Sequence, residues 1–259
     1  MAKRETILLL RGLVWVGLLL AIAAIVSGAI ARKETSPIAD VNVTVDPLPG
    51  NNFLITAEDV PAILERRFAH DPAMMAIGQV DVERVERVLE EDPFVQDAEA
   101  YVGAQNRLNI HVVQREPVLR VMDNNGLDYY LDADGQQMPP SAHYTARVLV
   151  ATGNLPPYEE LFREQEANTL NHVFALNELL REDDFLRALV EQIYVNNRGE
   201  LTLAPSVGNQ VILFGRYQQA EEKLHRLKVF YREGLPYKGW NAYRSFDLRY
   251  NGQVVCKKR

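Results

Sequence analysis

The sequence predicts an α+β protein with three parts: a single transmembrane helix, a small β-α-α-β-β module, and a strand-rich β domain with packed helices and a terminal edge hairpin. Residues 12–30 carry no charged side chain, and nineteen residues of helix match the apolar thickness of a bilayer. Residues 40–114 alternate between strand-like and helix-like apolar spacing, whereas residues after 117 form short β-prone runs between turn signals.

Composition narrows the classes of partner. The chain of 259 residues has a formal net charge of -7, which argues against a nucleic acid because phosphate neutralisation requires a basic face. Its one cysteine, Cys256, excludes an internal disulfide and a cysteine-based zinc site.

The amino end predicts a membrane anchor. Residues 1–11 form a short tail, and Lys3, Arg4 and Arg11 favour keeping it in the cytoplasm. The span predicted over Gly12 to Ala31 then places the rest of the chain on the far side of the membrane.

A cleaved signal peptide is the competing interpretation of this region. Ala29-Ile30-Ala31 has the small-residue form of a cleavage site. The apolar run is longer than the core of a usual signal peptide, which favours an uncleaved anchor.

The first module is expected over residues 40–116, after a polar linker at 32–39. Val41, Val43 and Val45 alternate as in a strand. Thr56 and Asp81 are expected to begin two helices, and two β-rich runs follow at 94–102 and 108–114. One small sheet backed by two helices suits this order.

Glu116-Pro117 marks the start of the β domain, residues 117–259, because proline cannot continue a central strand. The turn at 132–135 resembles the start of a calcium loop but lacks its further ligands, so we expect a tight turn. The expected elements are strands at 118–122, 127–132, 147–151, 193–196, 200–204 and 211–214. Helices are expected from Pro156-Pro157 to about Glu182 and over 217–233.

The chain closes with a predicted β-hairpin. Phe246, Leu248 and Tyr250 alternate with polar residues, and Asn251-Gly252 suits a two-residue turn. Such a turn would pair Leu248 with Val255 and Asp247 with Cys256. It would place Val255 on the inner face with Phe246, Leu248 and Tyr250, place Cys256 on the outer face, and leave the last strand as an open edge. Open edges recruit other strands, although an ordinary closing hairpin explains the pattern as well.

Five segments resemble the FtsQ/DivIB family of bacterial cell-division proteins. They are residues 92–95, 106–110 and 114–118, the D-A-D-G turn within 130–135, and the D-L-R-Y strand within 246–250. The resemblance spans the whole chain and identifies the first module as a POTRA domain. The sequence departs from enterobacterial members, which carry a bulky aromatic residue near the position of Val255 to Lys257.

The resemblance implies a non-enzymatic scaffold of the division machinery in the bacterial inner membrane, located at the septum. It implies that the last strand pairs with an FtsB/DivIC-like bitopic protein, which in turn holds FtsL, and so helps to control septal peptidoglycan synthesis. It also links the POTRA domain to other division proteins. Arg249 and Tyr250 match family positions expected to contact the partner, and hairpin geometry extends the expected contact set to Phe246, Gln253, Val254, Val255 and Cys256. For Tyr250, core packing is an equal alternative.

Enzymatic and adaptor functions are the alternatives to this one. The five histidines form no zinc-protease pair, and no nucleophile elbow or phosphate-binding glycine loop occurs, so no cofactor, metal or small-molecule substrate is expected. An anchored cell-wall hydrolase would require two distant carboxylates to meet in a cleft. A periplasmic POTRA-containing adaptor of another envelope assembly is the remaining alternative.

Overall fold

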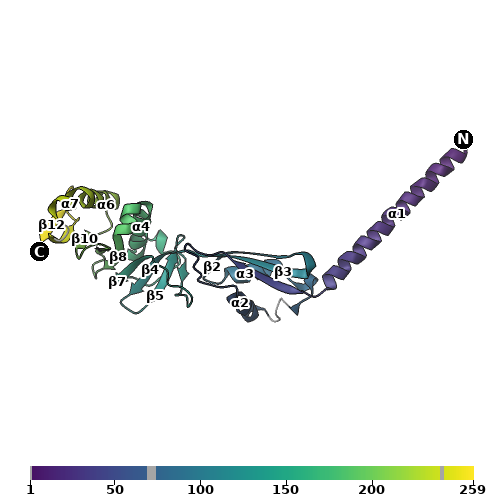
Figure 1. Cartoon of the computed structure of the whole chain (residues 1–259), viewed down its shortest axis with the longest axis horizontal. Helices are drawn as coiled ribbons and strands as arrows, with labels where there is room; N and C mark the ends of the chain where they lie inside the picture. The colour runs from purple at the N-terminus through teal and green to yellow at the C-terminus, as the bar shows by residue number, and fades with distance from the viewer. Residues whose placement is uncertain (1, 69–73, 240–241) are drawn as a thin grey trace. The chain divides into compact units, whose positions relative to one another are not determined.

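The computed structural model describes residues 2–68, 74–239 and 242–259; within the first helix, the side chains of residues 2–14, 16 and 29–31 are outside the description. The chain divides into two compact units, residues 1–114 and 115–259. Figure 1 traces both units along the chain.

The first unit has the β-α-α-β-β order expected from the sequence. Its three-stranded sheet has the order β1-β3-β2, with β1 parallel to β3 and β2 antiparallel to it. The elements are α1 (Ala2–Thr35), β1 (Asp40–Val45), α2 (Asp59–Arg67), α3 (Val82–Glu90), β2 (Val95–Val102) and β3 (Arg107–Gln114).

The capping and apolar spacing of α3 and β3 explain how this unit packs. The Asp81 carboxylate accepts a hydrogen bond from the Arg84 backbone N–H at 3.0 Å, which caps the start of α3. That helix buries Val85, Val88 and Leu89, and β3 buries every second side chain. The two apolar faces meet in one core, so periodicity alone specifies how the helix lies on the sheet.

Part of the segment expected as a polar linker packs against this unit. Residues 32–35 continue α1. The Ile38 N–H donates to the Met75 carbonyl at 3.1 Å, and the Ile77 N–H donates to the Ser36 carbonyl at 3.0 Å. The apolar side chain of Ile38 is buried, which supplies the driving force for this docking.

The predicted span at 12–31 lies within α1, and Met1 and the side chains of Lys3, Arg4 and Arg11 lie outside the described residues. In the described part of the chain, no helix combines the length and apolar character that crossing a bilayer requires. The span therefore stays a prediction.

The second unit is built on a nine-stranded sheet with the order β12-β11-β10-β9-β8-β7-β4-β5-β6. Its strands are β4 (Pro117–Asp123), β5 (Asp128–Asp132), β6 (Gln137–Met138), β7 (Leu149–Gly153), β8 (Val190–Val195), β9 (Leu201–Pro205), β10 (Val211–Gly215), β11 (Tyr243–Asp247) and β12 (Val255–Lys258). Its helices are α4 (Thr169–Glu182), α5 (Asp184–Leu189), α6 (Ala220–Val229) and α7 (Leu235–Lys238), and a π-helical turn, Phe230–Gly234, joins the last two.

Helices α4 and α6 gather on one side of this sheet (Figure 1) and share its core. The helix expected to follow Pro156-Pro157 begins only at Thr169, capped by Asn168, whose carboxamide oxygen accepts from the Leu170 N–H at 2.9 Å. The turn at Asp132 is structural: one carboxylate oxygen accepts from the Asp134 and Gln136 N–H groups at 2.9 and 2.7 Å. The expected tight turn is confirmed there.

Candidate partner-binding edge

Strand β12 is the outermost strand of the nine-stranded sheet, and it pairs with β11 alone among the described strands. Its outward N–H and C=O groups therefore face away from the sheet, in the arrangement that accepts an added strand. The observed pairs are Tyr243 with Lys258, Ser245 with Lys257, Phe246 with Cys256, and Asp247 with Val255.

This register differs by one residue from the register predicted from sequence. Asp247 pairs with Val255 rather than with Cys256, and a shift of one residue moves every side chain of a strand to the opposite face. Val255 is accordingly 39% exposed, whereas Cys256 packs against the core. The predicted assignment of Val255 to the inner face was wrong.

The cause of the shift is the connection between the strands. Residues 248–254 replace the expected two-residue turn, and only Gly252 of the Asn251-Gly252 pair has a positive φ, +68°. A type I′ turn needs positive φ at both positions. The Leu248 N–H instead donates to the Leu213 carbonyl of β10 at 2.9 Å.

Phe246 lies in the core beneath the edge and is fully buried. Its ring lies 5.0 Å from the ring of Phe230 and 5.6 Å from that of Tyr231, both in the π-helical turn. Tilted aromatic pairs at such distances stabilise a core beyond their buried area. In this conformation Phe246 packs on the inner face of the hairpin and offers no surface to a partner. This burial corrects its place in the expected contact set.

Tyr250 lies on the surface, with 52% of the residue exposed. This position excludes the core packing that the sequence left as an equal alternative. Within residues 243–259, the large apolar side chains exposed at the surface are Tyr250 and Val255, while Val254 is half-buried and Gln253 is exposed.

Arg249 is held by its own neighbour. Its guanidinium donates two hydrogen bonds to the two oxygens of the Asp247 carboxylate, at 2.9 and 2.6 Å. This hydrogen bonding holds the pKa of Asp247 below its ordinary value and raises that of Arg249. An acidic partner residue would thus meet an arginine whose orientation is already fixed.

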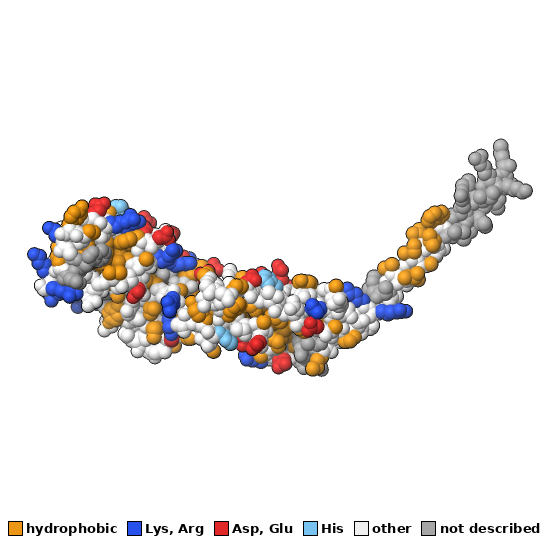
Figure 2. Space-filling model, viewed as in Figure 1, with side chains coloured by type: hydrophobic (Ala, Val, Ile, Leu, Met, Phe, Trp, Pro, Cys, Tyr) orange, Lys and Arg blue, Asp and Glu red, His pale blue; other side chains and the backbone are white. Residues whose placement is uncertain are grey.

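The edge is basic within an acidic chain. Residues 243–259 contain five Lys and Arg residues and one acidic residue, whereas the whole chain has a net charge of -7. Figure 2 shows Lys and Arg side chains gathered around the end of the unit that carries β12. Charge of this kind attracts an acidic strand and disfavours pairing with a second copy of the same strand.

Three carboxyl groups of the second unit, which are paired with basic side chains, are poorly suited to act as general acids. Hydrogen bonds from Arg120, Lys228 and Arg249 lower the pKa of Asp128, Asp183 and Asp247, respectively. A carboxyl group with a lowered pKa is ionised at neutral pH, so it has no proton to donate to a leaving group.

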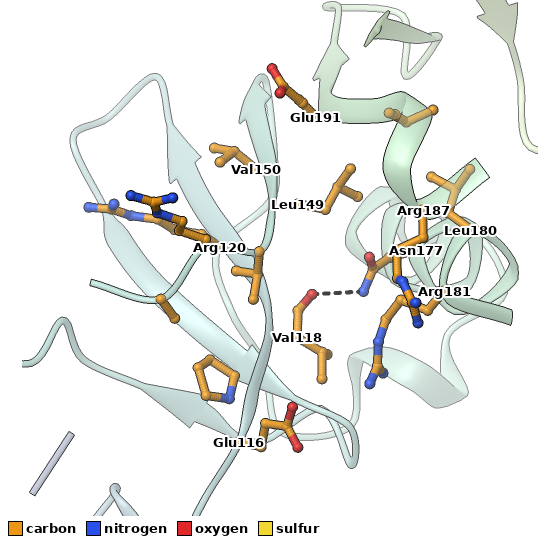
Figure 3. A pocket seen from close by; sticks show the side chains of 15 residues that line it. Glu116, Val118, Arg120, Leu149, Val150, Asn177, Leu180, Arg181, Arg187 and Glu191 are labelled. Atoms are coloured by element: carbon orange, nitrogen blue, oxygen red, sulfur yellow. Dashed lines mark hydrogen bonds between the residues drawn. The ribbon is translucent and has the colours of Figure 1, made fainter. Parts of the chain in front are cut away.

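A hollow of about 620 Å³ lies at the amino ends of β4, β7 and β8 (Figure 3). Its inner wall holds Asn177 of α4, which is 1% exposed and donates from its side-chain nitrogen to the Val118 carbonyl at 3.2 Å. This bond ties α4 to β4. Around it lie apolar side chains, including Leu149 and Leu180, with Arg181 and Arg187 on the side of α4 and α5.

His111 lies on the open face of the first unit's sheet. Its Nε2 atom is 2.9 Å from a carboxylate oxygen of Asp46, and the residue is half-buried. Among the described residues, no group of three or more His, Cys, Asp or Glu side chains is placed to hold a metal ion.

Comparison with known families agrees with the two units. Residues 116–257 match the family model described as FtsQ/DivIB, C-terminal related, and residues 39–113 match the POTRA-like domain model.

Three relatives carry the name Cell division protein FtsQ. The protein of Rhodothermus marinus is 30% identical over 215 residues, which cover 81% of this chain and 72% of the relative. The protein of Salinibacter ruber is 28% identical over 237 residues, which cover 84% of each chain. The protein of Chloroflexus aurantiacus is 26% identical over 172 residues, which cover 63% of this chain and 59% of the relative.

Proposed function

The chain belongs to the FtsQ/DivIB family of cell-division proteins, and on that basis we propose that it binds an FtsB/DivIC-like protein, together with FtsL, along the outer edge of β12. In this proposal the protein links early and late division proteins at the septum and so helps to control septal peptidoglycan synthesis. It is a scaffold and has no catalytic role.

The observation that carries this proposal is the position of β12 at the rim of the sheet, with Val255 exposed on the strand and Tyr250 exposed in the loop before it. Strand addition would supply backbone hydrogen bonds, and alternate side chains would supply the choice of partner. The fixed guanidinium of Arg249 and the terminal lysines favour a partner strand that carries acidic residues.

We also propose that α1 anchors the protein in the inner membrane, with the bulk of the chain in the periplasm. Large apolar side chains between residues 15 and 26 of α1 are exposed, as Figure 2 shows, and water is a poor environment for such a surface. A reporter enzyme that works only in the periplasm, fused to the carboxyl end, is expected to be active; activity of a cytoplasmic reporter at that end would contradict the topology.

The partner proposal predicts the effect of two substitutions. Tyr250→Ala removes a rigid anchor and should weaken binding of the FtsB/DivIC-like protein by about 2 kcal/mol. Val255→Asp places a negative charge beside the proposed acidic strand and should weaken binding to a similar extent. Surface plasmon resonance with full-length proteins in detergent measures both effects.

Two control substitutions match these in chemistry and exposure. Tyr194 on β8 is 45% exposed and Val211 on β10 is 44% exposed, and both strands lie inside the sheet. Tyr194→Ala and Val211→Asp should leave binding unchanged. Equal binding by folded Tyr250→Ala, Val255→Asp and control variants would count against the edge as the binding site.

A further inference from the structure

One arginine on α6 holds the loop between β11 and β12 by its backbone. Arg226 donates from one terminal nitrogen to the carbonyls of Tyr250 and Gln253, at 2.8 and 3.2 Å. Its other terminal nitrogen donates to the Leu248 carbonyl at 3.4 Å. A single side chain thus contacts residues 248, 250 and 253, which span most of the connection, 248–254, that replaced the expected tight turn.

The chemistry of arginine suits this role. The guanidinium is planar, permanently charged and presents several donors in a fixed fork, so it can hold several carbonyls at once. The side chain is only 13% exposed, and the Glu222 carboxylate lies 3.8 Å from its Nε atom. Its hydrogen bonds therefore go to the loop, and the glutamate supplies a nearby negative charge.

The neighbouring Lys223 uses its charge in a similar way. Its ammonium donates to the carbonyls of Phe214 and Arg216, at 3.0 and 2.9 Å, at the end of β10. Helix α6 therefore fixes the backbone at two points next to the edge hairpin, and Arg226 is the point that reaches the loop.

We propose that Arg226 is a positioning residue that holds the β11–β12 loop in the shape required by the partner. The inference rests on the proposed function, because the loop carries Arg249 and Tyr250 and leads directly into β12. Without the guanidinium, three carbonyls of the loop would turn to water and the loop would sample other conformations. Only the fraction of molecules with the correct loop shape would then be ready to bind.

This mechanism predicts a specific kinetic signature. If the loop must be ordered before binding, the observed association rate equals the intrinsic rate multiplied by the fraction of molecules whose loop is ordered. Disorder of the loop then slows association and leaves the dissociation rate unchanged. Direct contact between Arg226 and the partner would instead raise the dissociation rate. The two rates therefore distinguish positioning from contact.

The test compares full-length wild-type protein with three variants in detergent. Arg226→Met keeps the apolar stem and removes every donor, and Arg226→Lys keeps the charge but offers one ammonium in place of the fork. Glu222→Gln is the control, because it removes the charge beside Arg226 and leaves the three carbonyl bonds available. Hydrogen exchange on the unliganded proteins measures how well the loop amides are protected. Surface plasmon resonance with the FtsB/DivIC-like protein measures the association and dissociation rates.

We expect Arg226→Met to bind about tenfold more slowly, Arg226→Lys about threefold more slowly, and Glu222→Gln like wild type. Amide exchange should quicken over residues 249–255 in the two Arg226 variants, while β8 and β9 keep the protection of wild type and so show that the sheet is folded. Unchanged loop exchange in both Arg226 variants would overturn the positioning role, and so would a change confined to the dissociation rate. Absence of partner binding by wild type would overturn the proposed function instead, and the exchange measurement on unliganded protein would still decide the role of Arg226 in the loop.

Discussion

At the scale of single residues, Asp247 and Arg249 show how the chain fixes the orientation of a charged side chain at its surface. Asp247 is 9% exposed, and Arg249 is exposed. The carboxylate also accepts a hydrogen bond from the Arg249 backbone N–H at 3.0 Å. The pair therefore closes a small ring that fixes both the guanidinium and the start of the loop.

The lowered pKa of Asp247 predicts a pH-dependent contribution to stability. A carboxyl group whose pKa is lower in the folded chain than in the unfolded chain stabilises the fold fully above its unfolded pKa, about 3.9. This contribution disappears as the pH falls through the folded value. Asp247→Asn should lower the free energy of unfolding by about 1 kcal/mol at pH 7, a modest amount because Arg249 is exposed to solvent.

Denaturant unfolding of the full-length chain, followed by circular dichroism, checks this at pH 7 and pH 3. The difference between wild type and Asp247→Asn should shrink at the lower pH. A difference that is the same at both values would show that the ion pair does not contribute in the manner described.

Single residues also show what sequence patterns can predict. The start of α3 at Asp81 was predicted correctly, because its cap depends on a backbone N–H group only three positions away. Arg226 was missed. Its acceptors lie 22 to 27 positions along the chain, and an arginine next to a helix's apolar stripe gives no sign of a backbone contact at that separation.

At the scale of elements, the terminal hairpin shows where local pattern fails. Alternation and the Asn-Gly dipeptide correctly predicted two antiparallel strands. They predicted the wrong register, because the Leu213 carbonyl binds the Leu248 N–H and Arg226 holds the loop beyond it. Contacts from β10 and α6 therefore outweighed the intrinsic preference of the Asn-Gly turn. As a result Val255 lies on the outer face and Cys256 on the inner face, the reverse of the prediction.

Packing between β7 and β8 gives a second prediction at this scale. Gly153 ends β7 with φ of +104°, and a Cβ atom there would lie 2.2 Å from the Val195 carbonyl oxygen of β8. Gly153→Ala should lower the free energy of unfolding by more than about 2 kcal/mol, since backbone strain and a steric clash add.

Gly126 offers a matched control. It also has a positive φ, +87°, but a Cβ atom would meet nothing within 4 Å. Gly126→Ala should therefore cost only the conformational strain, about 1 kcal/mol. Thermal or denaturant unfolding of both variants measures the difference, and equal losses would show that β7 and β8 separate without penalty at this point.

At the scale of the whole molecule, the chain joins a POTRA-like unit to a β unit typical of the FtsQ/DivIB family. The boundary expected at Glu116-Pro117 lies within two residues of the division after Gln114. The order of motifs along the chain was enough to indicate the family. The register of β12 and the exposure of its side chains could be learned only from the three-dimensional structure. The family indicates which kind of complex to seek, and the proposal of strand addition assigns the contact on this chain to β12.

Hydrogen exchange of the full-length protein, with and without the FtsB/DivIC-like protein and resolved to single amides, tests the proposed pairing along β12 most directly. Strand addition predicts slower exchange on binding at alternate residues of β12, those whose N–H groups point away from β11, with little change in β1 and β2 of the first unit. Protection that appears in the first unit while β12 exchanges as before would contradict the proposal.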